Sequence, residues 1–443
     1  MNHNFSKLSI VVSNQFGERR VKWKSYKSYL KTQFFSTEEM SNYQNEKLQK
    51  LLENAFQNIP YYKKTILELG MDYKTININN INTLPFLTKD IIKKNNNELL
   101  NPNISPLRII PNSTSGSSGN KTVFYSDAHS ELFRAGLNWR SKKWVDLDIG
   151  NKELRIWGAR FDVIKTNNAL IKLRSFFRNK DVLSSYKLTP EIIKNYISFI
   201  NEYKPNQIHA YPSSIFEISK FMIDNNLQTF KPIVILTSGE QLYEWQREII
   251  ERAFGVNVYN FYGCREVGII AMECKEKKGL HIQAENIILE VVNEKGENIY
   301  DEEGEIVVTD LSNYVFPFIR YKILDRGILT KEKCACGVNL PLLKAVNGRT
   351  FDLVKLSNGG SIGATFFTHL FREKPGIEDF RIHQKNINEI LIEYIPENGE
   401  VDTDYFKTKI QKYSDNLLDI IFTRTDKFIT PDSGKKQFIK SFV

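Results

Sequence analysis

The stretch of sequence that decides the fold runs from Pro232 to Tyr259 and reads PIVILTSGEQLYEWQREIIERAFGVNVY. Its first five residues form an apolar run short enough to be a buried strand, and the turn 237–240 follows. The next segment predicts a helix, because its apolar residues fall on one face: Leu242, Trp245, Ile249, Ala253 and Phe254. Gly255 suits the cap of that helix, and 256–259 predicts a second strand. A strand–helix–strand unit favours a parallel sheet covered by helices, so the predicted fold class is α/β.

The sequence on either side of this unit predicts two domains. Residues 1–104 are mainly helical in pattern, with apolar residues at helical spacing in 43–56, and the segment from about 105 to 345 alternates short apolar runs with amphipathic helices. Beyond Arg349 the pattern changes to that of a small α+β domain of about 90 residues, with strands at 388–394 and 418–422 and a helix at 401–413. The predicted domains are therefore 1–349 and 350–443.

The composition narrows the class of protein. With 41% hydrophobic and 26% charged residues, the chain of 443 residues is globular rather than disordered or fibrous. Its net charge of +9 is spread among asparagines without a nucleic-acid-binding motif, so a small anionic ligand such as a nucleotide is expected rather than DNA or RNA.

Localisation is predicted from what the sequence lacks. Four unevenly spaced cysteines do not make a disulfide framework, which indicates a reducing compartment. No apolar run approaches the roughly 18–20 residues of a membrane span, and 8–12 is too short for a secretory signal. We therefore expect a cytoplasmic protein without a membrane span.

A loop rich in glycine, serine and threonine gives the strongest local signal. Residues 113–122 read STSGSSGNKT, in which Gly116 and Gly119 allow close approach of backbone N–H groups to phosphate oxygens. It is not a P-loop, because only Ser117 and Ser118 separate the glycines and a strand-like segment follows. Taken alone, the loop is equally well interpreted as a flexible surface linker.

Five further segments extend this signal, because they follow the loop in a fixed order. They are 238–240 (SGE), 261–268 (FYGCREVG), 318–325 (FIRYKILD), 348–352 (GRTFD) and 433–435 (SGK). With the loop, this series resembles the adenylate-forming enzymes, which include the acyl-CoA synthetases, and within them the branch of the phenylacetate–CoA ligases and the CapK-like capsule-biosynthesis proteins. The resemblance covers about 105 to 440 and implies a large multi-sheet N-terminal domain and a small mobile C-terminal domain.

The resemblance implies a role for each motif around ATP and Mg²⁺. The loop, through Ser115, Gly116, Ser117, Ser118, Gly119 and Lys121, would hold the phosphates, and Glu266 matches the family's Mg²⁺-binding carboxylate. The adenine-binding walls would be formed by Gly239, Glu240, Tyr262 and Gly263. Asp325 matches the ribose-binding aspartate, Arg349 would contact ribose or phosphate, and Asp352 matches the hinge. Lys435 matches the mobile catalytic lysine that stabilises charge on the α-phosphate.

Two departures from the family pattern leave a second hypothesis open. Asn120 stands where lysine often follows the second glycine, and Cys264-Arg265 replaces the usual small hydroxyl residues. These changes motivate the alternative of a degenerate, nucleotide-binding member without ligase activity. Taken without the resemblance, Asp325, Arg349 and Lys435 are each typical of exposed polar residues.

Four residues with soft ligand atoms form a candidate zinc site. Cys334-Ala335-Cys336 is a short CxC motif, and Cys274 and His281 supply two further ligands. Three thiolates and an imidazole suit tetrahedral zinc, and some phenylacetate-ligase-like proteins carry this arrangement as a structural site. The alternative is a pair of free thiols in a turn and an ordinary buried histidine.

The expected function is activation of a carboxylate as an acyl-adenylate, followed by transfer to the thiol of coenzyme A or to an amine. Trp157, His209 and Tyr211 are predicted to line the carboxylate pocket, where a histidine or arginine would favour a polar or anionic acid; the alternative is that Trp157 and His209 belong to the core. A saccharide precursor is a candidate acceptor if the protein acts in capsular polysaccharide biosynthesis. The identity of the acid and the oligomeric state do not follow from the sequence.

Overall fold

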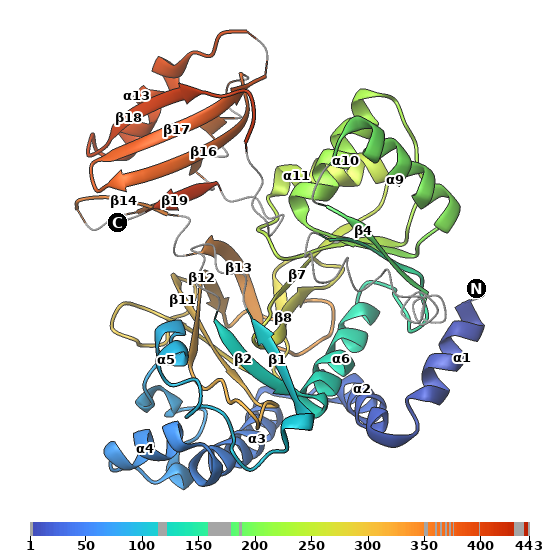
Figure 1. Cartoon of the computed structure of the whole chain (residues 1–443), viewed down its shortest axis with the longest axis vertical. Coiled ribbons are helices and arrows are strands. Elements are labelled where there is room, and N and C mark those ends of the chain that lie inside the picture. Colours follow the sequence, from blue (N-terminus) through green and yellow to red (C-terminus); the bar gives the residue numbers. More distant parts are fainter. Residues whose placement is uncertain are drawn as a thin grey trace. The chain divides into compact units, whose positions relative to one another are not determined.

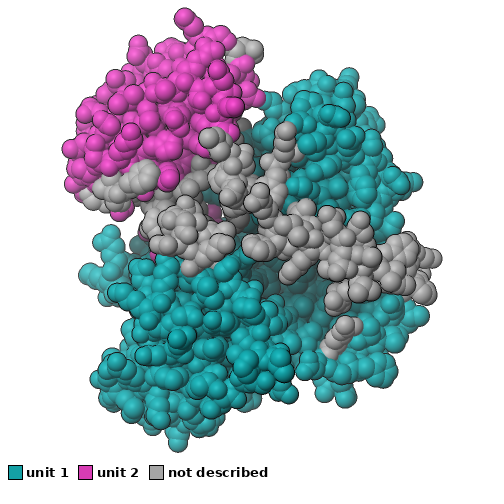
Figure 2. Space-filling view, in the orientation of Figure 1, with its two compact units in different colours: residues 1–323, 327–345 teal, residues 324–326, 346–443 magenta. Residues whose placement is uncertain are grey.

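The computed structural model describes residues 3–113, 122–157, 179–185, 188–349, 353–358, 361–363, 366–367, 370–371, 374, 376–397, 399–428 and 438–441. The chain divides into two compact units (Figures 1 and 2). Unit 1 comprises residues 1–323 and 327–345, and unit 2 comprises residues 324–326 and 346–443. Each unit is described by itself. Among the described residues, no helix is both long and apolar enough to cross a membrane.

The N-terminal part of unit 1 is built from helices. They are α1 (His3–Ser13), α2 (Arg20–Thr32), α3 (Thr37–Asn58), α4 (Pro60–Glu68) and α5 (Lys89–Lys94), with short 3-10 turns at η1 (Gly17–Arg19), η2 (Tyr73–Thr75), η3 (Ile81–Thr83) and η4 (Pro106–Arg108). A capping box starts α3, because Ser36 and Glu39 exchange side-chain and backbone hydrogen bonds. The helix predicted over 43–56 is confirmed, and its apolar face is buried.

An eleven-stranded sheet forms the centre of unit 1, in the order β10-β11-β12-β13-β9-β8-β7-β6-β5-β3-β4. Its parallel half consists of β3 (Glu153–Trp157), β4 (Lys180–Ser184), β5 (Gln207–Ala210), β6 (Val234–Thr237) and β7 (Val258–Cys264). The helices α9 (Pro190–Tyr203), α10 (Pro212–Asp224) and α11 (Glu244–Phe254) connect these strands. Strand β6, helix α11 and strand β7 confirm the predicted strand–helix–strand unit, and Gly255 ends α11 with a φ of 65°.

Helices cover both faces of the parallel strands (Figure 1). On one face, isoleucines and a methionine of α9 and α10 pack with Phe254 of α11 against inward-facing residues such as Ile208 and Ile235. On the other, Tyr29 of α2 and Leu137 of α6 (Ala128–Lys143) pack against Leu236. Because each strand is buried on both sides, β5 and β6 are buried along their whole length. The predicted α/β fold class is confirmed.

The other half of the sheet is reached through β7, which pairs in parallel with β6 and antiparallel with β8. Its strands are β8 (Gly268–Glu273), β9 (Leu280–Ile282), β10 (Ile287–Val292), β11 (Glu303–Asp310), β12 (Tyr321–Thr330) and β13 (Leu342–Arg349). A separate antiparallel hairpin of β1 (Ile109–Ser113) and β2 (Val123–Asp127) leads directly into α6. This hairpin flanks the predicted phosphate loop, of which 114–121 lies outside the described residues.

Unit 2 is an α+β unit. A four-stranded sheet has the order β18-β17-β16-β19, and β14 pairs with β15. The strands are β14 (Leu353–Lys355), β15 (Ser361–Gly363), β16 (Ile377–Asn386), β17 (Glu389–Pro396), β18 (Asp419–Arg424) and β19 (Ile439–Ser441), and the helix is α13 (Thr403–Tyr413). Phe406 and Ile410 of α13 pack on Ile382 and Ile392. The strands and helix predicted for this region are present, whereas the predicted boundary at residue 350 lies outside the described residues.

Candidate functional site

The parallel strands of unit 1 end together at one edge of the sheet. The register pairs Ile156 with Ala210, Ala210 with Thr237, and Thr237 with Asn260, so the segments that follow β3, β5 and β6 start side by side. In open α/β sheets, ligands bind at the carboxyl ends of the strands. The predicted pocket residues and the 238–240 motif are therefore brought to one edge.

The turn after β6 depends on Gly239 and Glu240. Gly239 has a φ of 83°, which side chains other than glycine rarely adopt. The Glu240 carboxylate accepts a hydrogen bond of 3.0 Å from the backbone N–H of Ser213, in the first turn of α10. A negative charge at a helix N-terminus is stabilising, so Glu240 fixes the 238–240 turn to α10.

His209 lies at the same edge and is buried. Its Nε2 is 2.7 Å from the hydroxyl oxygen of Ser238, whereas its Nδ1 has no hydrogen-bond partner among the described residues. Burial lowers the pKa of His209 to about 3, the charge of Arg155 acts in the same direction, and Glu153 opposes both. His209 is therefore neutral at physiological pH. A neutral imidazole offers hydrogen bonds rather than a charge, and the suggestion that His209 helps to hold a polar, anionic acid stays a prediction.

Aromatic rings surround His209. The ring centroids of Trp157 and Tyr211 are 4.2 Å apart, and those of Trp157 and His209 are 5.5 Å apart. Phe261 of β7 lies 5.3 Å from His209 on another side. Trp157 is half-buried, while Tyr211 is buried. The three predicted pocket residues are thus together, and Phe261 joins them although the sequence interpretation did not include it as a pocket residue.

Strand β7 carries the FYG motif past this edge. Its register with β8 is irregular between Tyr262 and Gly263. A Cβ atom at Gly263 would collide with the carbonyl oxygen of Gly268, so only glycine fits there. Tyr262 remains partly accessible. The motif therefore places an aromatic ring next to backbone that another chain segment already approaches closely.

Glu266 follows in the turn between β7 and β8 and is held from two sides. Its Oε1 accepts a hydrogen bond of 2.8 Å from the hydroxyl of Tyr321, the first residue of β12. Its backbone carbonyl accepts a hydrogen bond of 2.8 Å from Arg134 of α6. The Glu266 side chain is 5% exposed, and Tyr321 is fully buried. A carboxylate oxygen has two lone pairs, so Tyr321 orients Glu266 and still leaves acceptor capacity for a cation.

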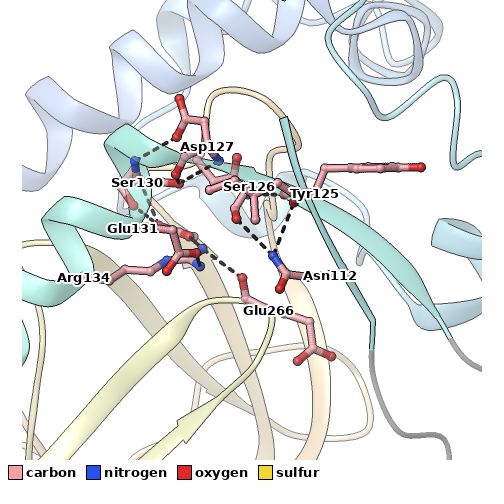
Figure 3. Close-up of polar contacts among 12 residues, drawn as sticks. Asn112, Tyr125, Ser126, Asp127, Ser130, Glu131, Arg134 and Glu266 are labelled. Atoms are coloured by element: carbon pink, nitrogen blue, oxygen red, sulfur yellow. Dashed lines mark hydrogen bonds and ion pairs between the residues drawn. The ribbon is translucent and has the colours of Figure 1, made fainter. Parts of the chain in front are cut away.

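Arg134 links Glu266 to the rest of unit 1. Its guanidinium pairs with Asp310 at 2.5 Å and with Glu131 at 3.1 Å. Figure 3 shows the Arg134 guanidinium facing the backbone of Glu266, whose carboxylate points the other way. The aliphatic part of Arg134 packs against Gly268, where a Cβ atom would come within 2.9 Å of it. Arg134 therefore fixes the turn that presents the Glu266 carboxylate.

The hairpin that flanks the phosphate loop is attached to the same helix. Asp127 and Ser130 form a capping box at the start of α6, and the amide of Asn112 donates to the hydroxyl of Ser126 across β1 and β2 (Figure 3). The side chain of Arg265, one of the residues that departs from the family pattern, donates to the backbone carbonyl of Ser113 at 3.3 Å. Glu266 and the base of the loop are thus connected through α6 and Arg265.

Other predicted residues belong to unit 2 or lie outside the described residues. Asp325 lies in β12 within the short segment 324–326 that belongs to unit 2. Arg349 is the last residue of β13. The loop residues Ser115, Gly116, Ser117, Ser118, Gly119 and Lys121, the hinge residue Asp352 and the catalytic lysine Lys435 lie outside the described residues. Their roles stay predictions.

The predicted zinc ligands come together in unit 1. The ligand atoms of Cys274, His281, Cys334 and Cys336 all lie within 4.8 Å of one another. The Sγ atoms of Cys274 and Cys334 are 3.6 Å apart, and the Cys336 Sγ is 3.2 Å from the His281 Nε2. A tetrahedron with Zn–S bonds of about 2.3 Å has edges of roughly 3.8 Å, so these separations fit a bound zinc ion.

The surroundings of this cluster also fit a cation. The His281 Nδ1 lies 3.4 Å from the carbonyl oxygen of Leu340, which leaves Nε2 to face the three sulfur atoms. Burial raises the pKa of the Cys274 thiol and lowers that of His281 to about 4. Burial alone therefore keeps Cys274 as a neutral thiol. A bound divalent cation would have the opposite effect, because it stabilises buried thiolates. The fourth cysteine, Cys264, lies at the end of β7 and is not part of the cluster.

We expect His209 to make stability depend on pH. Its pKa in the folded chain, about 3, is below the value of about 6.5 in an unfolded chain, so the unfolded state binds more protons between these values. The free energy of unfolding should therefore rise with pH up to about 6.5, by up to about 1.4 kcal/mol per pH unit from this group. Urea unfolding at about pH 5 and 7 should show a smaller difference for His209→Gln than for the wild type.

The matched control for this experiment is the exposed His129, replaced in the same way. His129→Gln should keep the pH dependence of the wild type. Equal pH dependence in the wild type and His209→Gln would contradict a neutral, buried His209.

Comparisons with known proteins show what the chain is similar to. No family model matches it. Protein CapK of Staphylococcus aureus is 26% identical over 411 residues, which cover 89% of this chain and 88% of that protein. A phenylacetate–coenzyme A ligase of Thermus thermophilus is 22% identical and covers 72% of each chain.

Solved structures agree with this relationship at the level of the fold. A 2-hydroxyisobutyryl-CoA ligase in the postadenylation state, in complex with 2-HIB-AMP, matches with a TM-score of 0.75 and 17% identity. The match covers 92% of this chain and 90% of that one. The predicted resemblance is confirmed: the chain is similar to CapK and to phenylacetate–coenzyme A ligases over most of its length, and its fold is similar to that of an acyl-CoA ligase.

Proposed function

We propose that the protein is an AMP-forming ligase that activates a carboxylate with ATP and transfers the acyl group to the thiol of coenzyme A. The observation that carries the proposal is the edge at which β3, β5 and β6 end and which β7 passes. There the residues predicted for the acyl pocket and those of the 238–240 and 261–268 motifs lie on adjacent strands or directly after them, which supports the proposal. The similarity to phenylacetate–coenzyme A ligases over 72% of the chain supports it.

The reaction balances in two steps. A carboxylate oxygen of the acid attacks the α-phosphorus of ATP, the bond to pyrophosphate breaks, and an acyl-adenylate forms. The sulfur of coenzyme A then attacks the acyl carbon, AMP leaves, and the thiol proton goes to solvent or base. Neither step needs a covalent enzyme nucleophile. The protein contributes placement of the reactants and stabilisation of charge.

Residue roles in the nucleotide site are proposed from the family resemblance and from the chemistry of each side chain. Tyr262 offers its ring to the adenine, next to Gly263, and Gly239 and Glu240 form the neighbouring wall. Glu266 would hold Mg²⁺, which neutralises phosphate charge, and Tyr321 and Arg134 orient Glu266. Asp325 and Arg349 are assigned to the ribose and phosphates, residues 115–121 to the phosphates, Lys435 to the α-phosphate, and Asp352 to the hinge.

The proposed acyl site favours an uncharged acyl group. His209 is neutral because burial lowers its pKa to about 3, and Trp157, Tyr211 and Phe261 surround it with aromatic surface. An additional carboxylate on the substrate would have no positive charge among these four side chains. Aromatic or small hydroxy acids are therefore the first class to test, ahead of uronic acids.

A role in surface polysaccharide biosynthesis is the finer proposal that the similarity to CapK supports. The similarity to CapK covers 89% of this chain at 26% identity, against 72% at 22% identity for the Thermus thermophilus ligase. In that role, the acceptor would be an amine of a saccharide precursor, which would attack the same acyl carbon in place of the thiol. AMP would leave as before, and the product would be an amide instead of a thioester.

A pyrophosphate-release screen tests the proposed function. Purified protein with ATP and Mg²⁺ should release pyrophosphate with at least one acid from a panel of aryl, hydroxy, amino and uronic acids. A thioester with coenzyme A, or an amide with an amino sugar, would identify the acceptor. Binding of ATP without pyrophosphate release across the whole panel would instead favour a degenerate, nucleotide-binding protein.

We also propose that Cys274, His281, Cys334 and Cys336 hold a structural zinc ion. All four lie in unit 1, where they join the β8–β9 region to the segment between β12 and β13. Cys336 also packs beside Met40 and Leu340. The site is separate from the reacting groups, so zinc would brace the fold and take no part in the chemistry.

Metal analysis of the purified protein should find about one zinc ion per chain. Cys336→Ser should lose most of the zinc and unfold at lower temperature, because a thiolate ligand is removed from a buried site. Cys264→Ser is the matched control, since this cysteine lies outside the cluster, and it should retain zinc. Four thiols that react freely with a thiol reagent in the folded protein would contradict the proposal.

A further inference from the structure

Helix α1 exposes two of its apolar side chains, Leu8 and Val12, while Ile10 and Val11 are partly buried and polar residues in and just after the helix are buried. Leu8 is 61% exposed and Val12 is 46% exposed, four residues apart, and Phe16, just beyond the helix, is 71% exposed. Ser6 and Asn14, in contrast, are 0% and 7% exposed. A surface helix normally has the opposite arrangement. The pattern indicates that the outer side of α1 is adapted to an apolar environment.

Positive charge is concentrated in the same part of the chain. Residues 3–36 contain seven lysines and arginines and one acidic residue, Glu18, so this segment carries +6 of the net +9. Arg20, Lys24, Lys27 and Lys31 are exposed and recur at helical spacing on α2, so they form one stripe. None of the four forms an ion pair with a carboxylate in the described part of the chain.

The helix that carries the basic stripe, α2, is packed against the rest of unit 1. Helix α2 packs directly on α6, where a Cβ atom at Gly136 would come within 3.2 Å of the Tyr26 backbone. The hydroxyl of Thr32, at the end of α2, donates to Glu285, which also pairs with the fully buried Arg140. Lys7 of α1 pairs with Asp148. Figure 1 shows α1 and α2 as consecutive helices of unit 1, joined through the short η1 turn.

We propose that α1 and α2 form a docking face for an anionic lipid surface. Exposed apolar side chains and a group of lysines and arginines in the same segment are the two signals that together hold a protein reversibly on such a membrane, the first by inserting at the headgroup boundary and the second by charge. A second copy of the chain is disfavoured as the occupant, because twofold symmetry would place the +6 segment against itself. A polyanion bound by charge alone would leave Leu8, Val12 and Phe16 without a role.

Vesicle flotation with the full-length protein tests this proposal. The protein should float with phosphatidylcholine vesicles that contain about 30% phosphatidylglycerol, but not with phosphatidylcholine alone, and about 0.5 M salt should weaken binding. Lys24→Gln/Lys27→Gln/Lys31→Gln should reduce partitioning about 10- to 100-fold. Leu8→Ser/Val12→Ser/Phe16→Ser should reduce it about tenfold or more.

The matched control removes three exposed lysines elsewhere in unit 1. Lys63→Gln/Lys64→Gln/Lys94→Gln, on α4 and α5, should float like the wild type. Nucleotide binding by all three variants should be unchanged, because none of the substituted residues is among those assigned to the nucleotide or the acyl group. Three results would overturn the proposal. The first is an absence of flotation with anionic vesicles. The second is flotation that the apolar substitutions leave intact, which would indicate a polyanion site. The third is a dimer in light scattering that those substitutions dissociate.

Discussion

Replacing Glu266 with glutamine is expected to lower the rate of pyrophosphate release by about 10²- to 10³-fold at saturating ATP. Glutamine keeps the size of the side chain and an oxygen that accepts the hydrogen bond from Tyr321, so the turn should stay folded. What is lost is the negative charge that would hold Mg²⁺ against the phosphates. The rate should be measured as a function of Mg²⁺ concentration with an acid identified in the screen.

Tyr321→Phe separates orientation of the carboxylate from its charge. This variant keeps the charge and loses the 2.8 Å hydrogen bond to Oε1, so the rate should fall by about tenfold, the order expected for one hydrogen bond to a charged group. More Mg²⁺ should be needed for half-maximal activity. A Glu266→Gln enzyme with unchanged activity and Mg²⁺ dependence would remove Glu266 from the proposed site.

Lys435→Ala should abolish most of the first half-reaction and spare the second. The lysine is proposed to stabilise charge on the α-phosphate as pyrophosphate leaves, and loss of such a group costs about 10²- to 10³-fold. Carboxylate-dependent pyrophosphate release should fall by that factor. Thioester formation from coenzyme A and a supplied acyl-adenylate should continue at close to the wild-type rate. In this step the acyl group is already activated by its bond to AMP, and no pyrophosphate has to leave.

Neighbouring lysines provide the control for this second experiment. Lys436→Ala and Lys440→Ala remove the same charge within five positions and should leave both half-reactions nearly unchanged. Equal losses in both half-reactions for Lys435→Ala would show that the variant is damaged as a whole. Equal losses in all three variants would show that the charge of this segment matters rather than one amine.

The central part of the fold could be predicted from the sequence because local patterns and tertiary burial agree there. The run 232–236, the amphipathic pattern of α11 and Gly255 each specify their own conformation, and the sheet then buries both faces of the strands. The antiparallel half of the sheet, which begins with the pairing of β7 and β8, could not be predicted from local sequence patterns. The pairing of β7 with β8 depends on the turn around Glu266 and on Arg134, which is far away in the sequence.

The candidate site was predicted in part for similar reasons. Glu266, Tyr262 and His209 stand in short motifs that point to their place, whereas Arg134 and Asp310 look like ordinary charged residues on an exposed helix and strand. Their ion pair spans 176 positions and is buried at both ends. No periodicity or local spacing contains that information. The neutrality of His209 is likewise a consequence of burial, which only the folded sheet determines.

The residues proposed to bind ATP and those proposed to bind the acid lie on different strands, which has a consequence for engineering. Tyr262, Gly263 and Glu266 belong to one continuous segment at and just after the end of β7. Trp157 lies in β3, His209 in β5, and Tyr211 between β5 and α10. On the proposed function, a mutant library confined to the second group would change the acid that is accepted and leave ATP recognition intact. Substrate selectivity should therefore be adjustable without changing the residues proposed to bind ATP.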